Sequence, residues 1–196
     1  MSDRLSHSLR SDAADNRDRI VEAARALFAT EGMTVTMRQI ARRAGIGPAT
    51  LYRRFPTKQL LAAEAFAEQV RDCRAIVDDG LAEEDPWRGF CQVIERICEV
   101  NADSRGFTEA FLATYPGAAD FTVHREYTLR AVARLAERAK KTGHLRADFT
   151  SEDLVMMLSA HGGIRATNPA LRRAASRRFA ALTIQAFRAW PARLSG

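Results

Sequence analysis

The stretch from residue 36 to residue 56 constrains the fold of this chain more than any other part of the sequence. Apolar residues recur at helical spacing in its first half, and Gly45 predicts the end of that helix because glycine readily takes the left-handed conformation. Gly47 and Pro48 suit the cap and first position of a second helix, where proline leaves no N–H unpaired. The stretch therefore predicts a helix-turn-helix.

The second helix of this pair is expected to expose a face suited to DNA. Leu51 and Phe55 lie four residues apart and should face inward, which leaves small, hydroxyl-bearing and cationic residues outside. We expect groove and base-edge contacts from Pro48, Ala49, Thr50 and Arg53. Contacts that position the phosphates are expected from Thr36, Arg38, Tyr52, Arg54 and Lys58.

The charge distribution supports a nucleic-acid partner. Residues 1–58 carry 11 Lys and Arg against 6 Asp and Glu, whereas residues 59–196 carry 19 against 18. No acidic residue occurs from Gly32 to Ala63, although this segment contains six cations: Arg38, Arg42, Arg43, Arg53, Arg54 and Lys58. A solvated helix face normally mixes charges of both signs, so the pattern favours a surface that displaces counterions from phosphates.

The same stretch resembles the DNA-binding domain of the tetracycline-repressor (TetR-like) family of bacterial transcription regulators. The resemblance includes Thr36, Ile40-Ala41, Ala44-Gly45-Ile46, Thr50-Leu51-Tyr52, Phe55, Lys58 and Leu60, with Leu27-Phe28 and Glu31-Gly32 upstream. The chain departs from the family pattern at three positions: Gly47 replaces a usual Ser, Ala49 a usual Gly and Arg54 a usual His. The first departure removes a capping hydroxyl, and the last adds a cation.

The remaining chain predicts an all-α protein of about nine helices. We expect a disordered arm over residues 1–14, a helix-turn-helix domain over 15–60 and a helical ligand-binding and dimerisation domain over 61–196. A first helix is expected over 15–30, and a long helix capped by Thr57 should run continuously to about Asp79. Gly80 to Pro86 should break the helical pattern. Later helices are expected over about 87–102, 104–115, 118–142, 150–164 and 169–190.

The C-terminal region contains more aromatic and sulfur side chains than a dimerisation domain requires. In the family it resembles, a small molecule commonly binds here and releases DNA, which implies a cavity lined by Phe66, Val70, Trp87, Phe90, Cys91, Ile94, Phe107, Phe111, Tyr115, Tyr127, Met157 and His161. The family also pairs its last two helices across a twofold axis, which implies a homodimer interface that includes Leu158, Phe179, Leu182, Thr183, Ala186, Phe187 and Trp190.

Other chemistry has little support in the sequence. The four histidines are widely separated, and no HExxH, CxxC, GxSxG, P-loop or GxGxxG pattern occurs. We therefore expect no catalytic residue, no metal and no cofactor. The three cysteines, an odd number, and the absence of a secretory or membrane-spanning apolar run favour a cytoplasmic protein.

Three functions remain open: a ligand-released repressor, a DNA-binding protein of the same fold without a small-molecule switch, and a thiol enzyme or sensor that uses Cys91 and Cys98.

Overall fold

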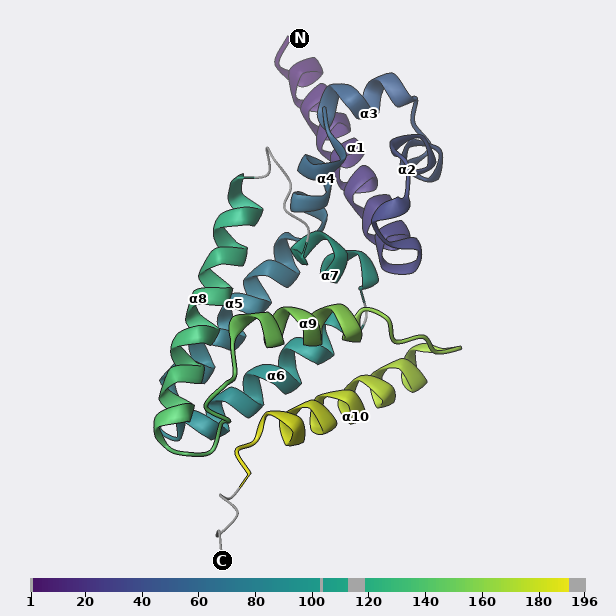
Figure 1. The fold of residues 1–196 in the computed structure, drawn as a ribbon. Coiled ribbons are helices and arrows are strands. Elements are labelled where there is room, and N and C mark those ends of the chain that lie inside the picture. Colours follow the sequence, from purple (N-terminus) through teal and green to yellow (C-terminus); the bar gives the residue numbers. More distant parts are fainter. Residues whose placement is uncertain (1, 103, 113–118, 191–196) are drawn as a thin grey trace, which may run out of the picture.

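The computed structural model describes residues 2–102, 104–112 and 119–190, and within these residues it is all-helical. It contains ten α-helices and a short 3₁₀ helix, and a single antiparallel bridge joins Leu145 to Arg188 (Figure 1). The predicted all-α class is confirmed, and the expected nine helices become ten. No helix among the described residues is both long and apolar enough to cross a membrane.

The N-terminal elements form the expected helix-turn-helix unit. They are α1 (Ser2–Glu31), the 3₁₀ helix η1 (Gly32–Thr34), α2 (Met37–Ala44) and α3 (Pro48–Arg54). Thr36 caps α2 reciprocally: its hydroxyl accepts from the Gln39 N–H at 3.3 Å, and Gln39 Oε1 accepts from the Thr36 N–H at 2.8 Å. Gly45 ends α2 in the left-handed region at φ 68°, as its position in the sequence predicts.

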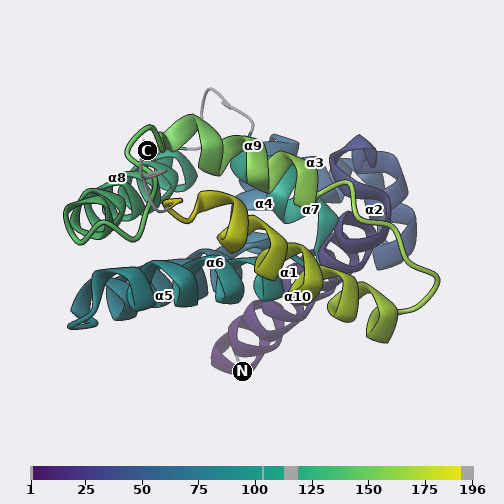
Figure 2. The same cartoon turned by 60° about the horizontal axis from the view of Figure 1, so that its bottom comes forward.

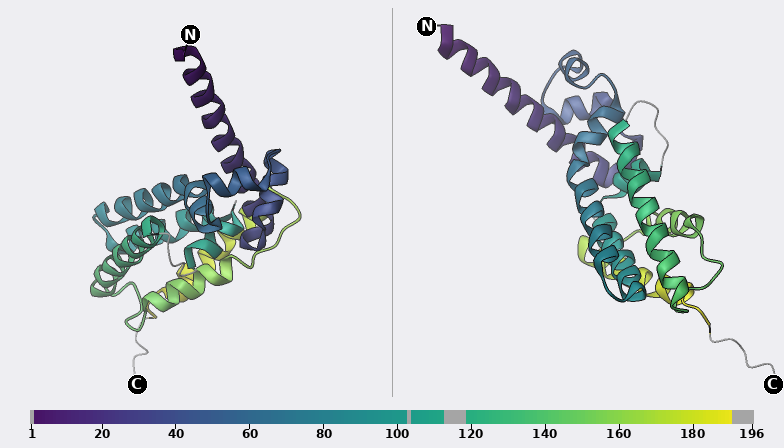
Figure 3. Two further views of the ribbon diagram at one scale, coloured as in Figure 1. Left: turned by 90° about the horizontal axis from the view of Figure 1, so that it is seen from above. Right: turned by 90° about the vertical axis from the view of Figure 1, so that its left-hand side faces the viewer.

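Helix α1 is longer than expected, because it begins at Ser2 rather than near Asp15. The segment predicted as a flexible arm is thus helical in the structure, and it extends away from the other helices (Figure 3). The polar composition of residues 2–14 suggested disorder. However, no glycine or proline interrupts residues 2–31, so the backbone can continue one helix through them.

The long helix expected after Thr57 is divided at Phe66 into α4 (Lys58–Ala65) and α5 (Ala67–Ala82). Phe66 has φ −102° and ψ 7°, outside the regular helical region. The Arg25 guanidinium of α1 donates to the Ala65 carbonyl at 2.9 Å, which satisfies a backbone acceptor at the break. The Phe66 ring packs between Phe28 and Phe107, with ring centroids 5.5 and 5.6 Å away. Contacts from distant parts of the chain therefore accompany the break.

The C-terminal domain surrounds α6 (Pro86–Ala102), which contacts α5, α8 and α10. Figure 1 shows α5 and α8 side by side, and Figure 2 shows α9 and α10 together on one side of α6. The remaining helices are α7 (Arg105–Leu112), α8 (Ala119–Lys141), α9 (Ser151–His161) and α10 (Pro169–Phe187). A capping box between Thr150 and Asp153 opens α9, and Gly143 follows α8 at φ 73°.

Gly80 does not break a helix, contrary to our expectation. It is buried within α5, where α5 crosses α6 at Gly89. A Cβ atom placed on Gly89 would lie 2.4 Å from the Gly80 carbonyl oxygen, and one placed on Gly80 would lie 2.4 Å from a Val93 methyl. The two glycines therefore allow direct backbone contact between the helices.

Candidate DNA interface and effector cavity

The predicted DNA-binding residues lie on one module made of α2, α3 and the start of α4. Arg38 lies on α2, Thr36 caps that helix, six of the others lie along α3, and Lys58 begins α4. All are exposed except Thr50 and Lys58, which are half-buried; the Tyr52 ring is 48% exposed. Because the Tyr52 ring is exposed, its hydroxyl is available for contact with a phosphate or with the edge of a groove.

Apolar burial and contacts with α1 and α4 hold α2 and α3 in place. Leu51 is fully buried and Phe55 is 3% exposed, as the spacing predicts. The Arg19 guanidinium of α1 donates to the Ala44 carbonyl at 2.6 Å and so satisfies an acceptor at the end of α2. Arg17 forms an ion pair with Glu64 and lies 5.2 Å over the Phe55 ring. These contacts hold α3, the second helix of the helix-turn-helix, against the rest of the domain.

Lys58 has a structural role that its sequence position does not reveal. Its ammonium group donates to the Met33 carbonyl at 2.6 Å and to the Val35 carbonyl at 3.2 Å. Two of its three N–H groups therefore join α4 to the end of η1, and one remains for another acceptor. A phosphate contact from Lys58 remains a proposal, and it involves a side chain that the fold already holds.

The C-terminal domain contains a small apolar cavity between α5, α6, α7, α8 and α9. Its volume is about 10 Å³, which is room for about one water molecule. Of the predicted ligand-binding residues, Phe107 and Phe111 line it. Thr108 and Thr128 also line it, although their hydroxyls interrupt the apolar stripes from which the lining was predicted. The remaining lining residues are Cys73, Ile97, Asn101, Leu129, Leu154 and Leu158.

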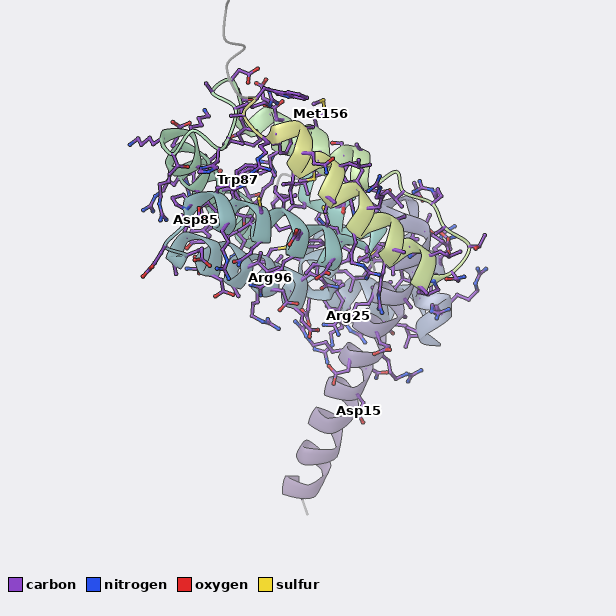
Figure 4. All side chains as sticks on the ribbon, turned by 90° about the horizontal axis from the view of Figure 1, so that it is seen from below. Asp15, Arg25, Asp85, Trp87, Arg96 and Met156 are labelled. Atoms are coloured by element: carbon purple, nitrogen blue, oxygen red, sulfur yellow. The ribbon has the colours of Figure 1, made fainter. Side chains whose placement is uncertain are left out.

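The other predicted ligand-binding residues do not converge on this cavity. Trp87 lies at the far end of α6 (Figure 4). It stacks on Phe90, which also packs against Phe149 and Phe187. The Tyr127 ring lies beneath the Arg74 guanidinium. None of the following lines the cavity: Phe66, Val70, Trp87, Phe90, Cys91, Ile94, Tyr127, Met157 and His161. Tyr115 lies outside the described residues. The spacing of the sequence placed these aromatic residues on the inner faces of helices. It did not show that the cavity lies near the C-terminal end of α6, away from Trp87 and Phe90.

Two residues predicted at a dimer interface are instead buried in the core of the chain. Leu158 is 3% exposed and lines the cavity, and Phe187 is 5% exposed in the aromatic cluster around Phe90. Phe179 and Thr183 are half-buried, with Phe179 against the His161 ring. The other three lie on the surface: Leu182, Ala186 and Trp190. Both helical neighbours and dimer mates select apolar residues, so spacing alone does not separate the two roles.

The cysteines are poor candidates for thiol chemistry. Burial raises the pKa of the Cys98 thiol to about 12 and that of Cys91 to about 11. Cys98 lies 3.9 Å from the Met157 sulfur in an apolar environment, and the thiols of all three cysteines are free. The thiolate is the reactive form of cysteine. These environments therefore disfavour the thiol enzyme or sensor considered above.

Helix α7 connects the cavity with the DNA-binding domain. Phe107, Thr108 and Phe111 line the cavity, while the carboxylate of Glu109 accepts from the Met33 N–H at 2.7 Å in η1. A Cβ atom on Gly106 would lie 2.7 Å from the Phe28 carbonyl oxygen, so α7 packs directly on the backbone of α1. One short helix thus contacts the cavity and two elements of the N-terminal domain.

Comparisons with known proteins agree with this arrangement. Residues 20–65 match the family model described as bacterial regulatory proteins, tetR family. An HTH-type transcriptional regulator of Staphylococcus aureus (strain USA300) is 49% identical over 51 residues, which are 26% of this chain and 28% of that protein. The chain thus matches less than a third of the length of this curated relative, all of it in one segment.

Solved structures match over most of the chain. A TetR transcriptional regulator from Streptomyces coelicolor has a TM-score of 0.54 and 27% identity, and the match covers 89% of this chain and 99% of that one. A ketosteroid transcriptional regulator of Mycobacterium tuberculosis has a TM-score of 0.66 at 17% identity, covering 89% and 95% of the two chains. The second likeness concerns the fold.

Fold and site together define an all-helical protein with an N-terminal helix-turn-helix domain and a helical C-terminal domain that contains a small cavity. The match to the family model and the matches to solved structures both point to one group within that class. Residues 20–65 form a DNA-binding domain of the tetR family of bacterial regulatory proteins, and the fold of the described chain is similar to that of TetR transcriptional regulators.

Proposed function

We propose that this protein is a cytoplasmic, ligand-responsive transcriptional repressor that binds a pseudo-palindromic operator as a homodimer. A small molecule in the C-terminal domain releases the DNA. The observation that carries the proposal is the exposed surface of α2 and α3, which presents Arg38 and Arg53 with no acidic residue from Gly32 to Ala63. The match of residues 20–65 to the tetR family model and the 49% identity over 51 residues to an HTH-type transcriptional regulator support the same function.

Arg53 is expected to read bases. It is exposed on α3 one position after Tyr52. Arg53→Ala should weaken operator binding by about 1 to 3 kcal/mol while leaving binding to random DNA nearly unchanged. Fluorescence anisotropy with both duplexes over a range of salt concentrations measures this difference. Equal losses on both duplexes would assign Arg53 to the backbone.

Lys58→Ala serves as the matched comparison for Arg53→Ala. It should weaken binding to both duplexes equally. It should also reduce, by about one unit, the slope of the logarithm of the binding constant against the logarithm of the salt concentration. Because the Lys58 ammonium also binds the Met33 and Val35 carbonyls, the same change should lower the thermal stability. Arg53→Ala removes an exposed side chain, so its melting temperature should stay close to that of the parent.

The dimer places two copies of α3 about 34 to 36 Å apart, one helical turn of DNA, so that each copy reads half of an inverted repeat. Exposed apolar side chains on α9 and α10 support this interface: Met156 is 64% exposed, Leu171 54% and Leu182 47%. Figure 4 shows Met156 at the surface beside α10. In an isologous interface both protomers use the same surface, so each of these side chains occurs twice, once on either side of the twofold axis.

In the proposed mechanism, the apolar cavity must open before a ligand can bind. At about 10 Å³ it is far smaller than an organic molecule, since ligand pockets usually measure about 300 to 1,000 Å³. An effector must therefore separate the cavity walls, which include Phe107 and Phe111 of α7. Movement of α7 acts on η1 through Glu109 and on α1 through the close contact at Gly106. The proposed coupling thus runs through α7.

The test of the proposal begins with an operator selected from random-sequence DNA by the full-length chain. A metabolite panel screened by thermal shift then supplies an effector, whose affinity is measured by calorimetry with and without saturating operator. A coupling of about 1 to 3 kcal/mol should make effector binding about 5 to 150 times weaker on the operator complex, because coupling between two sites is reciprocal. Equal effector affinities would contradict ligand release while leaving operator binding intact.

The small volume of the cavity also supports an alternative function, a DNA-binding protein of the same fold without a small-molecule switch. In that case the operator is selected as before. No compound in the panel then changes operator affinity, and a protein partner or DNA architecture controls occupancy.

A further inference from the structure

A second cavity, separate from the apolar one, lies where the N-terminal and C-terminal domains meet. It measures about 90 Å³. Its walls come from the last turn of α1, from α6, from the end of α9 with the loop that follows, and from α10. Ala29 and Thr30, Asn101, His161 and Ser176 represent these four walls. A molecule bound here would contact both domains at once.

His161 presents a hydrogen-bond acceptor in this cavity. The Ser176 hydroxyl donates to the Cys98 carbonyl at 2.8 Å, so its oxygen must accept the proton of His161 Nε2, which also lies 2.8 Å away. The ring is 3% exposed, and burial lowers the pKa of His161, which keeps the ring neutral at pH 7. Nδ1 therefore carries a lone pair, and it has no hydrogen-bond partner among the described residues.

Two further acceptors line the same cavity. Asn101 is 7% exposed, and its Oδ1 atom has no partner within the described part of the chain. The Thr30 hydroxyl uses its proton on the Ala26 carbonyl at 3.1 Å, which leaves the oxygen as an acceptor. Buried acceptors without donors are costly and rare in folded proteins. The two buried ones, on His161 and Asn101, line one cavity beside the exposed Thr30 oxygen, which indicates a ligand that brings hydroxyl or amine protons.

The charged side chains that line the cavity, among the residues the structure describes, have a single sign. Arg165 and Arg172 line it, and no described acidic side chain does. Arg165 donates to the Gly162 carbonyl at 3.0 Å, which uses part of its donor capacity and holds the guanidinium at the loop between α9 and α10. A guanidinium has five N–H donors and matches the geometry of carboxylate and phosphate oxygens.

We propose that this interdomain cavity binds a small hydroxylated organic anion. Its anionic group pairs with Arg165 and Arg172. Each of its hydroxyl groups donates one hydrogen bond, to one of three acceptors: His161 Nδ1, Asn101 Oδ1 or the Thr30 oxygen. The site differs from the apolar effector cavity in its walls and chemistry, and Asn101 is the one residue that lines both. Binding here ties α1 to α9 and α10 and does not depend on the operator.

The first experiment is calorimetry on the full-length chain without DNA. Four probes form two pairs: 3-hydroxybutyrate with butyrate, and glycerol 3-phosphate with propyl phosphate. In at least one pair the hydroxylated member should bind at least about tenfold tighter, because only it supplies the donor. The pair that responds identifies the anion as a carboxylate or a phosphate. Equal affinities within both pairs, or no binding by any probe, would overturn the proposal.

Substitutions locate the site and its donors. Arg165→Gln and Arg172→Gln should each weaken the responding probe about tenfold, and Thr30→Val should weaken the hydroxylated member alone. All three residues are exposed or half-buried, so the fold should tolerate these changes. Arg178→Gln, an exposed change on α10 outside the cavity, is the control and should leave binding unchanged. Unchanged binding in all three cavity variants would place the probe elsewhere and refute the assignment.

Discussion

A chain that carries Met156→Glu together with Leu182→Glu should be monomeric and should lose operator affinity by about 100-fold or more. Both side chains are exposed within one chain, at 64% and 47%, so the substitutions create no buried charge in the monomer. In the proposed dimer each substitution appears twice near the twofold axis, where unpaired carboxylates would be buried. The loss on DNA follows because a monomer no longer gains from linking two half-site contacts.

Light scattering, circular dichroism and operator binding measure this result, with helix content expected to remain at the parent level. Val123→Glu provides the control, since Val123 is also a large exposed apolar residue, at 60%, but lies on α8. That variant should remain dimeric and bind the operator normally. A double variant that stays dimeric would move the interface away from α9 and α10.

Gly89→Ala should destabilise the protein by about 2 kcal/mol or more, although alanine is the better helix former by about 1 kcal/mol. The added Cβ atom would lie 2.4 Å from the Gly80 carbonyl oxygen and 3.2 Å from Glu83 Cβ. Because the first neighbour is backbone, α5 and α6 must separate along their crossing. For a chain of this size the melting temperature should fall by about 4 to 8 °C.

Gly47→Ala is the control for this experiment. A Cβ atom there meets nothing within 4 Å, and the residue has φ −71°, which alanine readily adopts. The change should cost less than about 1 kcal/mol, the size of a helix-cap effect. If calorimetry gave the two variants the same melting temperature, the close contact between α5 and α6 would be wrong.

Local features of the N-terminal third could be predicted because the interactions that form them span few residues. The Thr36 cap, the left-handed Gly45 and Pro48 at the first position of α3 each depend on neighbours within one helical turn. The absence of acid from Gly32 to Ala63 is likewise a property of the sequence. The helix-turn-helix and its cationic surface therefore follow from spacing and charge.

The cavity residues and the roles of single side chains were harder to predict. Trp87 and Phe107 are both aromatic residues that the sequence placed in the ligand cavity. In the structure Trp87 lies in the cluster around Phe90, and Phe107 lines the apolar cavity. Lys58 reads as a phosphate contact, whereas the fold directs its ammonium to two carbonyls of η1 and the residue after it. Such outcomes depend on which distant helix a side chain meets.

The sequence by itself thus determined the helical class, the helix-turn-helix and its charge, since periodicity, caps and composition act over short distances. Only the tertiary structure decided where the helix after Thr57 divides, because Phe28, Phe107 and the Arg25 guanidinium meet at Phe66 and Ala65 from other helices. It also turned Gly80 from an expected helix end into a crossing point, since the need for a residue without Cβ arises from Gly89 on the facing helix. Close packing between distant segments imposes both choices, and no local pattern in the sequence records them.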